Sequence, residues 1–462
     1  MTDLEAVMWI LDSDPRLSSA FANLTILDRA PDRERLRSRM DAATSVVSRL
    51  RHRVVEDGGP LATPAWREDP DFDLDRHIRW MDLGSDDLDD VVAGLAGHPF
   101  DRDRPLWEFV VIEGLAGGRA AMVQRFDHTI TDGEGGIRLS TQFLDIERDP
   151  PPRGEAAPRS TDDRTGPEPT EPEGTADGIG ALWWPFNGLR NLADAPVAAI
   201  RSVTGMPART AEILDTALDA VQQLAVDGRR SPLWTERSTE HWFGRSALDL
   251  AQVKDAAHAL GGSVNDLFVT GALEGASRVH RAAGLDVEQL RVAIPVSTRQ
   301  RGSSGGNSFN PSHTLLPAGD MPVEERFAAV HERLGRVKET QRGVSLDGAV
   351  AALRLMPSSA LIGLAGRTAG AIDLVCSNVR AAPFDLYIAG AKLLSNYPLG
   401  PLVNTAFNLT TMSYRGWLFL GLVADPVAVP DPSALLDAID ESYTEILAAG
   451  GVTDRRRPEA GP

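Results

Sequence analysis

The sequence predicts a mixed α/β protein of two halves, and three observations support this prediction. The chain has 462 residues, 42% of them hydrophobic, which is enough to form a large core and more than one domain. Runs typical of strands alternate with runs typical of helices both early and late in the chain. Between them, residues 149–177 are so rich in proline and charge that no core can form, and we expect a disordered linker there.

The first half, residues 1–148, combines both kinds of element. The apolar or alternating runs at 107–115 and 119–128 predict strands, because strand side chains point alternately to opposite faces. Helical spacing of apolar residues predicts helices at 32–54 and 87–99.

The second half, residues 236–452, is of the same class. A helical crossover is expected at 178–235 before it, and a polar tail, 453–462, follows it. Strand patterns lie at 240–248, 290–298 and 416–425, and helical patterns at 215–228, 250–261, 264–284 and 432–450. Strands and helices on both sides of the linker favour two domains of similar type.

Composition excludes several classes of function. A net charge of −19 argues against a nucleic-acid partner, since binding phosphates requires a positive field. The single cysteine, Cys376, can form neither an internal disulfide nor a thiolate metal cluster, and we expect it to be a small buried hydrophobe. The first residues lack a basic segment and a cleavage site, so they do not resemble a signal peptide. A cytoplasmic protein is expected.

Two apolar stretches, 178–189 and 356–366, have some membrane character. Charges interrupt both well before the roughly 20 apolar residues that a membrane span needs. We expect buried or amphipathic helices at both places, and peripheral contact with a membrane or lipid droplet stays open.

The stretch QRFDHTITDGEGG, residues 124–136, contains the candidate catalytic histidine. If the strand continues to His128, then Gln124, Phe126 and His128 share one face. Asp127 then lies on the opposite face, where it is expected to pair with Arg125. The glycines that follow permit a tight turn, so His128 is predicted to lie where a strand ends and a cleft opens.

Taken alone, His128 is better explained as a strand cap or a surface histidine than as a catalytic base. It is accompanied, however, by the stretches FDRDRPLWEFVVIEGL (100–115), GGSVNDLFVTGALEG (261–275), AIPVSTRQRGSSGGNSFNPSHTLLP (293–317) and SYRGWLFLGLVADPVAVPD (413–431). This ordered set resembles the bacterial wax ester synthase/diacylglycerol acyltransferase family, within the CoA-dependent acyltransferases that share an HHxxxDG motif. The resemblance extends from about 71 to 431 and weakens in the first 60 residues.

The resemblance implies a fold of two chloramphenicol-acetyltransferase-like domains with the active site between them. It also implies that His128 is the general base, in the position of the second motif histidine. The other motif positions that it assigns are Asp132, Gly133, Pro105, Leu106, Trp107, Asn265, Asp266, Pro295, Val296, Ser297, Gly306 and Asn307. Asn265 is either an oxyanion donor or structural, and Asp132 either forms an ion pair with Arg299 or caps the next helix.

Two departures from the family pattern concern the site. Asp127 replaces the first motif histidine, and SNVRAAP at 377–383 replaces the more usual SNVPGP. Since the strand places Asp127 off the reacting face, its presence leaves the base in place.

The resemblance implies transfer of a fatty acyl group from acyl-CoA, a co-substrate, to a long-chain alcohol or diacylglycerol, with no cofactor. An alcohol is a poor nucleophile at neutral pH, and a histidine can take its proton during attack. A metal site at His128 and Asp132 is disfavoured because no third ligand has suitable spacing, and the GSSGG string at 302–306 lacks the strand and helix of a nucleophile elbow. Two alternatives stay open: another hydroxyl or amine acceptor, and a non-catalytic protein that binds acyl lipids.

Overall fold

The structure is a computed structural model that describes residues 1–56, 63–131, 136, 139–150, 228, 231–297, 309–310, 312–341, 350, 353–354 and 356–456. Several sequence predictions therefore lie outside the described residues. They are the linker beyond residue 150, nearly all of the crossover at 178–235, the GSSGG string, and the site residues Asp132, Gly133, Arg299, Gly306 and Asn307.

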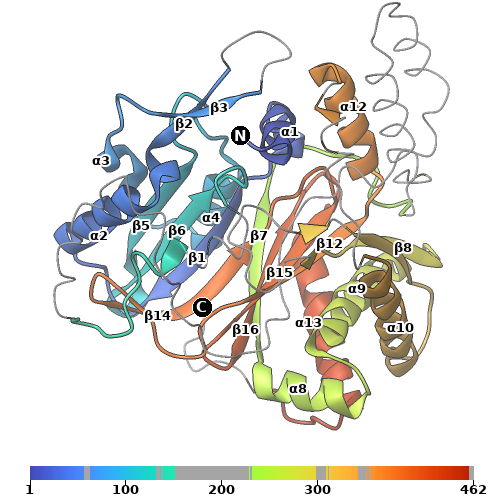
Figure 1. The fold of residues 1–462 in the computed structure, drawn as a ribbon. Helices are drawn as coiled ribbons and strands as arrows, with labels where there is room; N and C mark the ends of the chain where they lie inside the picture. Colours follow the sequence, from blue (N-terminus) through green and yellow to red (C-terminus); the bar gives the residue numbers. More distant parts are fainter. Residues whose placement is uncertain are drawn as a thin grey trace, which may run out of the picture.

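Within the described residues, two six-stranded sheets form the frame of the molecule (Figure 1). The first sheet has the order β13-β14-β1-β6-β5-β4, with strands Tyr387–Ile388, Ala391–Leu399, Phe21–Leu27, Arg119–Phe126, Trp107–Leu115 and Ile78–Asp82. The second has the order β11-β8-β12-β15-β16-β7, with strands His313–Pro317, Gln289–Ala293, Leu374–Arg380, Phe407–Tyr414, Trp417–Ala424 and Trp242–Asp249. Two short pairs accompany them: β2 (His52–Val55) with β3 (Ala65–Glu68), and β9 (Val296–Ser297) with β10 (Phe309–Asn310).

Helices pack around both sheets. The α-helices are α1 (Asp3–Leu11), α2 (Arg33–Val46), α3 (Leu74–His77), α4 (Leu88–Gly97), α8 (Leu250–Ala259), α9 (Val264–Ala282), α10 (Val323–Gln341), α12 (Ser358–Ala369) and α13 (Pro432–Ala449), and the 3₁₀ turns are η1 (Pro15–Leu17), η2 (Ser48–Arg51) and η3 (Ala116–Gly118). Local sequence starts several of them. The side chains of Asp249, Ser263 and Asp431 accept backbone N–H groups at the first turns of α8, α9 and α13.

Most of the strands and helices predicted from sequence are confirmed, and the differences have local causes. β5 covers the predicted 107–115, whereas β6 ends at Phe126, two residues earlier than predicted. The predicted strand at 290–298 is divided into β8 and β9 around Pro295, which has no N–H to give to a strand ladder. The predicted helix at 32–54 ends at Val46, because His52–Val55 pairs with β3 instead.

The sequence predicts a division of the chain into two halves at residue 148, and this boundary remains a prediction. Two segments pack against the half to which they do not belong in sequence. β14, from late in the chain, pairs antiparallel with β1 in the first sheet. At the other end of the chain, α1 packs beside α12, where Val7 and Met8 share an apolar cluster with Leu361 (Figure 1). Each half is therefore completed by a piece of the other.

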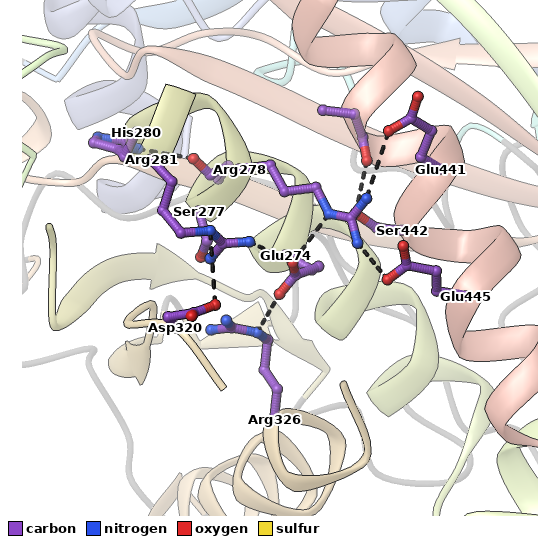
Figure 2. Close-up of polar contacts among 12 residues, drawn as sticks. Glu274, Ser277, Arg278, His280, Arg281, Asp320, Arg326, Glu441, Ser442 and Glu445 are labelled. Atoms are coloured by element: carbon purple, nitrogen blue, oxygen red, sulfur yellow. Dashed lines mark hydrogen bonds and ion pairs between the residues drawn. The ribbon is translucent and has the colours of Figure 1, made fainter. Parts of the chain in front are cut away.

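A buried ionic cluster joins three helices beside the second sheet (Figure 2). Glu274 of α9 forms an ion pair with Arg326 of α10 at 2.6 Å and accepts hydrogen bonds from Arg278 at 3.0 Å and from Arg281 at 2.8 Å. Arg278 also reaches Glu445 of α13. Burial alone would raise the pKa of Glu274, but the arginines outweigh it, so the pKa is lowered and the group is ionised.

The apolar stretches behave as expected where the structure describes them. Residues 356–366 overlap α12, an amphipathic helix that buries Leu361 and Leu364, whereas 178–189 lie outside the described residues. In the parts of the chain that the structure describes, no helix is both long and apolar enough to traverse a bilayer. Cys376 is buried in β12, as predicted, and burial raises the pKa of its thiol.

Candidate active site at His128

His128 lies in a tight turn immediately after β6. The N–H of Asp127 bonds to the carbonyl of Leu106 at 3.0 Å, and the N–H of Ile130 bonds to the carbonyl of Asp127 at 3.0 Å, which closes the turn. The His128 side chain is only 1% exposed, and its ring lies 4.5 Å from the ring of Phe21. The predicted position at the end of a strand is confirmed.

A cavity of about 630 Å³ lies in front of His128. Its walls come from β1, β6 and β14 of the first sheet and from β12 and β15 of the second. Most of the lining is apolar, including Phe21, Phe126, Leu393, Leu399 and Met412. A cavity of this size and lining suits an apolar chain whose reacting end reaches His128.

The predicted ion pair of Asp127 with Arg125 is wrong. Arg125 pairs with Glu108 at 2.8 Å. The Asp127 carboxylate accepts the N–H and the hydroxyl of Thr129, at 2.8 and 2.6 Å. The reason is that strand alternation ends at Phe126, where this side-chain turn begins. Asp127 nevertheless lines a different cavity from His128, so its expected position away from the reacting side is confirmed.

Asp127 belongs to a buried pair of carboxyl groups that the sequence did not reveal. Its partner is Asp12, which accepts the N–H of Ser19 at 2.6 Å and its hydroxyl at 3.1 Å. Burial raises the pKa of Asp127, and burial together with the charge of Asp127 raises the pKa of Asp12 well above its ordinary value. Arg102, stacked on the Trp9 ring at 3.5 Å, is a nearby cation whose charge interacts with both carboxyl groups. The raised pKa values keep a proton on this pair to a higher pH than on an exposed aspartate, and the protonated Asp12 donates to Asp127.

The Pro105-Leu106-Trp107 element packs beside the turn that holds His128. The Leu106 carbonyl is the acceptor for Asp127 noted above. The Trp107 indole is buried, stacks on His77 at 4.6 Å and donates to the carbonyl of Leu50 at 2.8 Å. These contacts give the element a structural role beside the site, away from the cavity surface in front of His128.

The structure does not bring Asn265 into the cavity of His128. Asn265 lies in the first turn of α9, where its side-chain oxygen is 3.5 Å from the amide of Asn378, and it is not among the residues that line the cavity. Asp266 accepts the N–H and hydroxyl of Ser263, both at 2.8 Å, and contacts His331 at 2.8 Å. This geometry favours the structural alternative for Asn265 and gives Asp266 a capping role at the start of the same helix.

Sequence reasoning missed a group of polar side chains in the cavity wall. They are Asn23, Thr25, Gln124 and Asn396. A signal was present, since Gln124 shares the predicted face of His128 and β1 alternates polar and apolar residues, but the pairing of β1 with β14 is not visible in the sequence. Among the residues that the structure describes, no group of three or more histidine, cysteine, aspartate or glutamate side chains could hold a metal ion.

Comparison with known proteins agrees with the resemblance that the motifs indicate. A family model for the wax ester synthase/diacylglycerol acyltransferase catalytic domain matches residues 1–268, and one for the C-terminal domain of the same proteins matches residues 305–447. A provisionally named diacylglycerol O-acyltransferase of Mycobacterium tuberculosis is 33% identical over 459 residues, which cover 97% of this chain and 91% of that protein.

Solved structures extend the likeness to the fold. The wax ester synthase/diacylglycerol acyltransferase of Marinobacter aquaeolei superposes with a TM-score of 0.64 at 20% identity, over 96% of this chain and 98% of that one. The first condensation domain of the calcium-dependent antibiotic synthetase superposes with a TM-score of 0.57 at 17% identity, over 100% and 97% of the two chains. The predicted two-domain, chloramphenicol-acetyltransferase-like α/β architecture is confirmed.

Proposed function

Since this chain belongs to the wax ester synthase/diacylglycerol acyltransferase family, we propose that His128 is the general base of its acyl transfer from acyl-CoA to a lipid hydroxyl. The observation that carries this proposal is the buried His128 ring at the wall of a large apolar cavity. The acceptor is a long-chain alcohol or diacylglycerol.

The proposed reaction needs one proton relay. His128 takes the proton of the acceptor hydroxyl as the oxygen attacks the thioester carbonyl, and a tetrahedral oxyanion forms. When the intermediate collapses, the carbon–sulfur bond breaks, and the histidinium returns its proton to the CoA sulfur. The products are an ester and CoA, and no covalent enzyme intermediate is needed. An ion pair between Asp132 and Arg299 remains a prediction from the family resemblance.

The rim of the cavity supports peripheral contact with a membrane or lipid droplet. Ile146 and Phe384 are 70% and 52% exposed although both are large and apolar, and both also line the cavity. Two backbone hydrogen bonds of 2.8 Å between Asp145 and Tyr387 hold their segments together. An apolar rim that opens directly onto a lipid surface would let a substrate chain pass into the cavity without crossing water.

The experiment that tests the proposal compares wild type with His128→Ala. We expect turnover, measured as CoA release, to fall by about 10² or more while the thermal midpoint stays near that of wild type. Near-native turnover of the variant would refute the role of His128. Mass spectrometry of products from acyl-CoA with mixed alcohols, diacylglycerol and amines identifies the acceptor. Acyl-chain binding without any CoA release would instead indicate a non-catalytic lipid-binding protein.

A further inference from the structure

Four polar side chains form a strip across three neighbouring strands in the wall of the His128 cavity. This polar strip consists of Asn23 and Thr25 of β1, Gln124 of β6 and Asn396 of β14. The strand register places Asn23 opposite Gln124 and Thr25 opposite Asn396, so the four lie side by side. The surrounding lining is mostly apolar, and buried polar groups cost stability unless they have a use or a partner.

The hydrogen bonds within the polar strip do not use all of the donors and acceptors of its side chains. Thr25 donates to Asn396 at 2.9 Å and accepts from Asn23 at 3.1 Å and, weakly, from Gln124 at 3.4 Å. Asn23 also donates to Asn396. Among the described residues, the amide nitrogen of Asn396 has only the thioether of Met412 as an acceptor, at 3.0 Å, which is a weak bond.

One buried polar atom of the polar strip has no partner. The side-chain oxygen of Asn23 is buried and accepts no hydrogen bond from the described residues. Turning the amide over would place a nitrogen in the same position, so the vacancy does not depend on how the amide is assigned. The polar strip therefore offers an acceptor next to amide N–H groups that are poorly used. A hydroxyl group, which both donates and accepts, matches this combination.

The polar strip lies along the strands at some distance from His128. The His128 ring contacts Phe21, and Phe21 pairs with Phe126 at the end of the cavity nearest the turn. Asn23 and Gln124 are each two residues farther along their strands, about 7 Å from the Phe21–Phe126 pair. A substrate chain that reacts at His128 and extends along these strands would pass the polar strip several bonds from its reacting carbon.

We propose that the polar strip binds a second oxygen function of the lipid substrate, a hydroxyl group along the chain, and so selects hydroxylated chains over plain hydrocarbon chains. This inference rests on the proposed acyl transfer in the same cavity. A plain chain leaves the buried amides without a partner, and this asymmetry is the source of the selectivity.

The test compares matched substrates in a CoA-release assay with the full chain. One arm uses two acyl-CoAs of equal length, with and without a mid-chain hydroxyl, and a plain long-chain alcohol as acceptor. The other arm uses plain acyl-CoA with a long-chain alcohol or the corresponding diol. We expect kcat/KM to be at least about tenfold higher for the hydroxylated member in one arm. The arm that shows the preference identifies whether the acyl chain or the acceptor lies on the polar strip.

Variants connect this preference to the polar strip. Gln124→Met and Asn23→Leu replace amides by apolar groups of similar size, and each should move the ratio of the two kcat/KM values towards one. Gln252→Met, the same change on α8 outside the cavity, should keep the wild-type ratio. Thermal midpoints show that the variants are folded. A wild-type ratio near one in both arms, or variants that keep the preference, would overturn the proposal.

Equilibrium binding separates this inference from the proposed function. Calorimetry with the plain alcohol and the diol, and with the two acyl-CoAs, measures the preference of either arm without turnover. Preferential binding of the diol with no CoA release from any substrate would support the polar strip and refute acyl transfer. Turnover of plain substrates without any preference in rate or binding would support acyl transfer and refute the role of the polar strip, whose vacancy would then be a site for water only.

Discussion

Asp127→Asn tests the account of the residue that departs from the family motif. In the wild type, Asp12 donates its retained proton to Asp127, and Asp127 accepts from Thr129. In the variant the new amide oxygen can keep the bonds from Thr129, while its N–H₂ donates to Asp12. Burial still raises the pKa of Asp12 in the variant, but by less in total, because the neighbouring negative charge of Asp127 is gone.

The effect on stability depends on pH in a definite direction. Because burial raises the pKa of both carboxyl groups, the folded wild type holds protons over a pH range in which the unfolded chain has released them. Its free energy of unfolding therefore falls as pH rises above about 4, the ordinary pKa of aspartate, and continues to fall up to the raised values. Within that pH range, each of the two carboxyl groups lowers the free energy of unfolding by up to about 1.4 kcal/mol for each unit that the pH rises. The variant removes the titrating carboxyl group of Asp127 and makes the pKa of Asp12 less strongly raised.

We expect Asp127→Asn to be as stable as wild type near pH 4 and more stable at pH 8, with the difference growing by at most about 1.4 kcal/mol for each pH unit over which the wild-type group stays protonated only in the folded state. Urea unfolding of both proteins across this range measures the difference. Turnover should change little, since Asp127 does not line the cavity of His128. Asp75→Asn, an exposed control, should show no such trend. A variant that is less stable at pH 8, or a difference that does not vary with pH, would refute the shared proton.

Two further predictions concern the ionic cluster and the cavity rim. Glu274→Ala leaves a buried arginine unpaired and should lower the free energy of unfolding by about 3 to 5 kcal/mol in urea titrations, whereas the exposed Glu441→Ala should cost at most about 1 kcal/mol. Since the pKa of Glu274 is lowered, its contribution is present above the ordinary glutamate pKa and is lost as pH falls through the lowered value. The stability of Glu274→Ala should therefore approach that of wild type in acid. The double change Ile146→Ser with Phe384→Ser should weaken binding to phospholipid vesicles in a flotation assay. The control Val46→Ser changes a similarly exposed residue elsewhere and should bind vesicles like wild type. Equal binding by wild type and both variants would exclude the rim as the lipid contact.

Local sequence determined much of the fold and the position of the base. The alternation at 107–115 gave rise to β5 over those residues, and Ser263 with Asp266 begins α9 where the helical pattern starts. The motif likewise placed His128 at the end of β6. These features depend on neighbours within a few residues, which is the range over which side-chain periodicity and helix capping act.

Tertiary structure alone decided what surrounds the base. Pairing of β14 with β1 brings Asn396 beside Thr25, two residues separated by most of the chain, and so creates the polar strip. The sequence predicted an ion pair between Asp127 and Arg125. In the fold, the N-terminal segment brings Asp12 to Asp127 instead, and Arg125 pairs with Glu108. The sequence left an oxyanion role and a structural role open for Asn265, and the fold places its side chain beside Asn378 at the start of α9. A residue's partners across sheets and helices are set by chain segments far away in sequence, and the burial that shifts a pKa or leaves an amide without a partner exists only after those segments have packed.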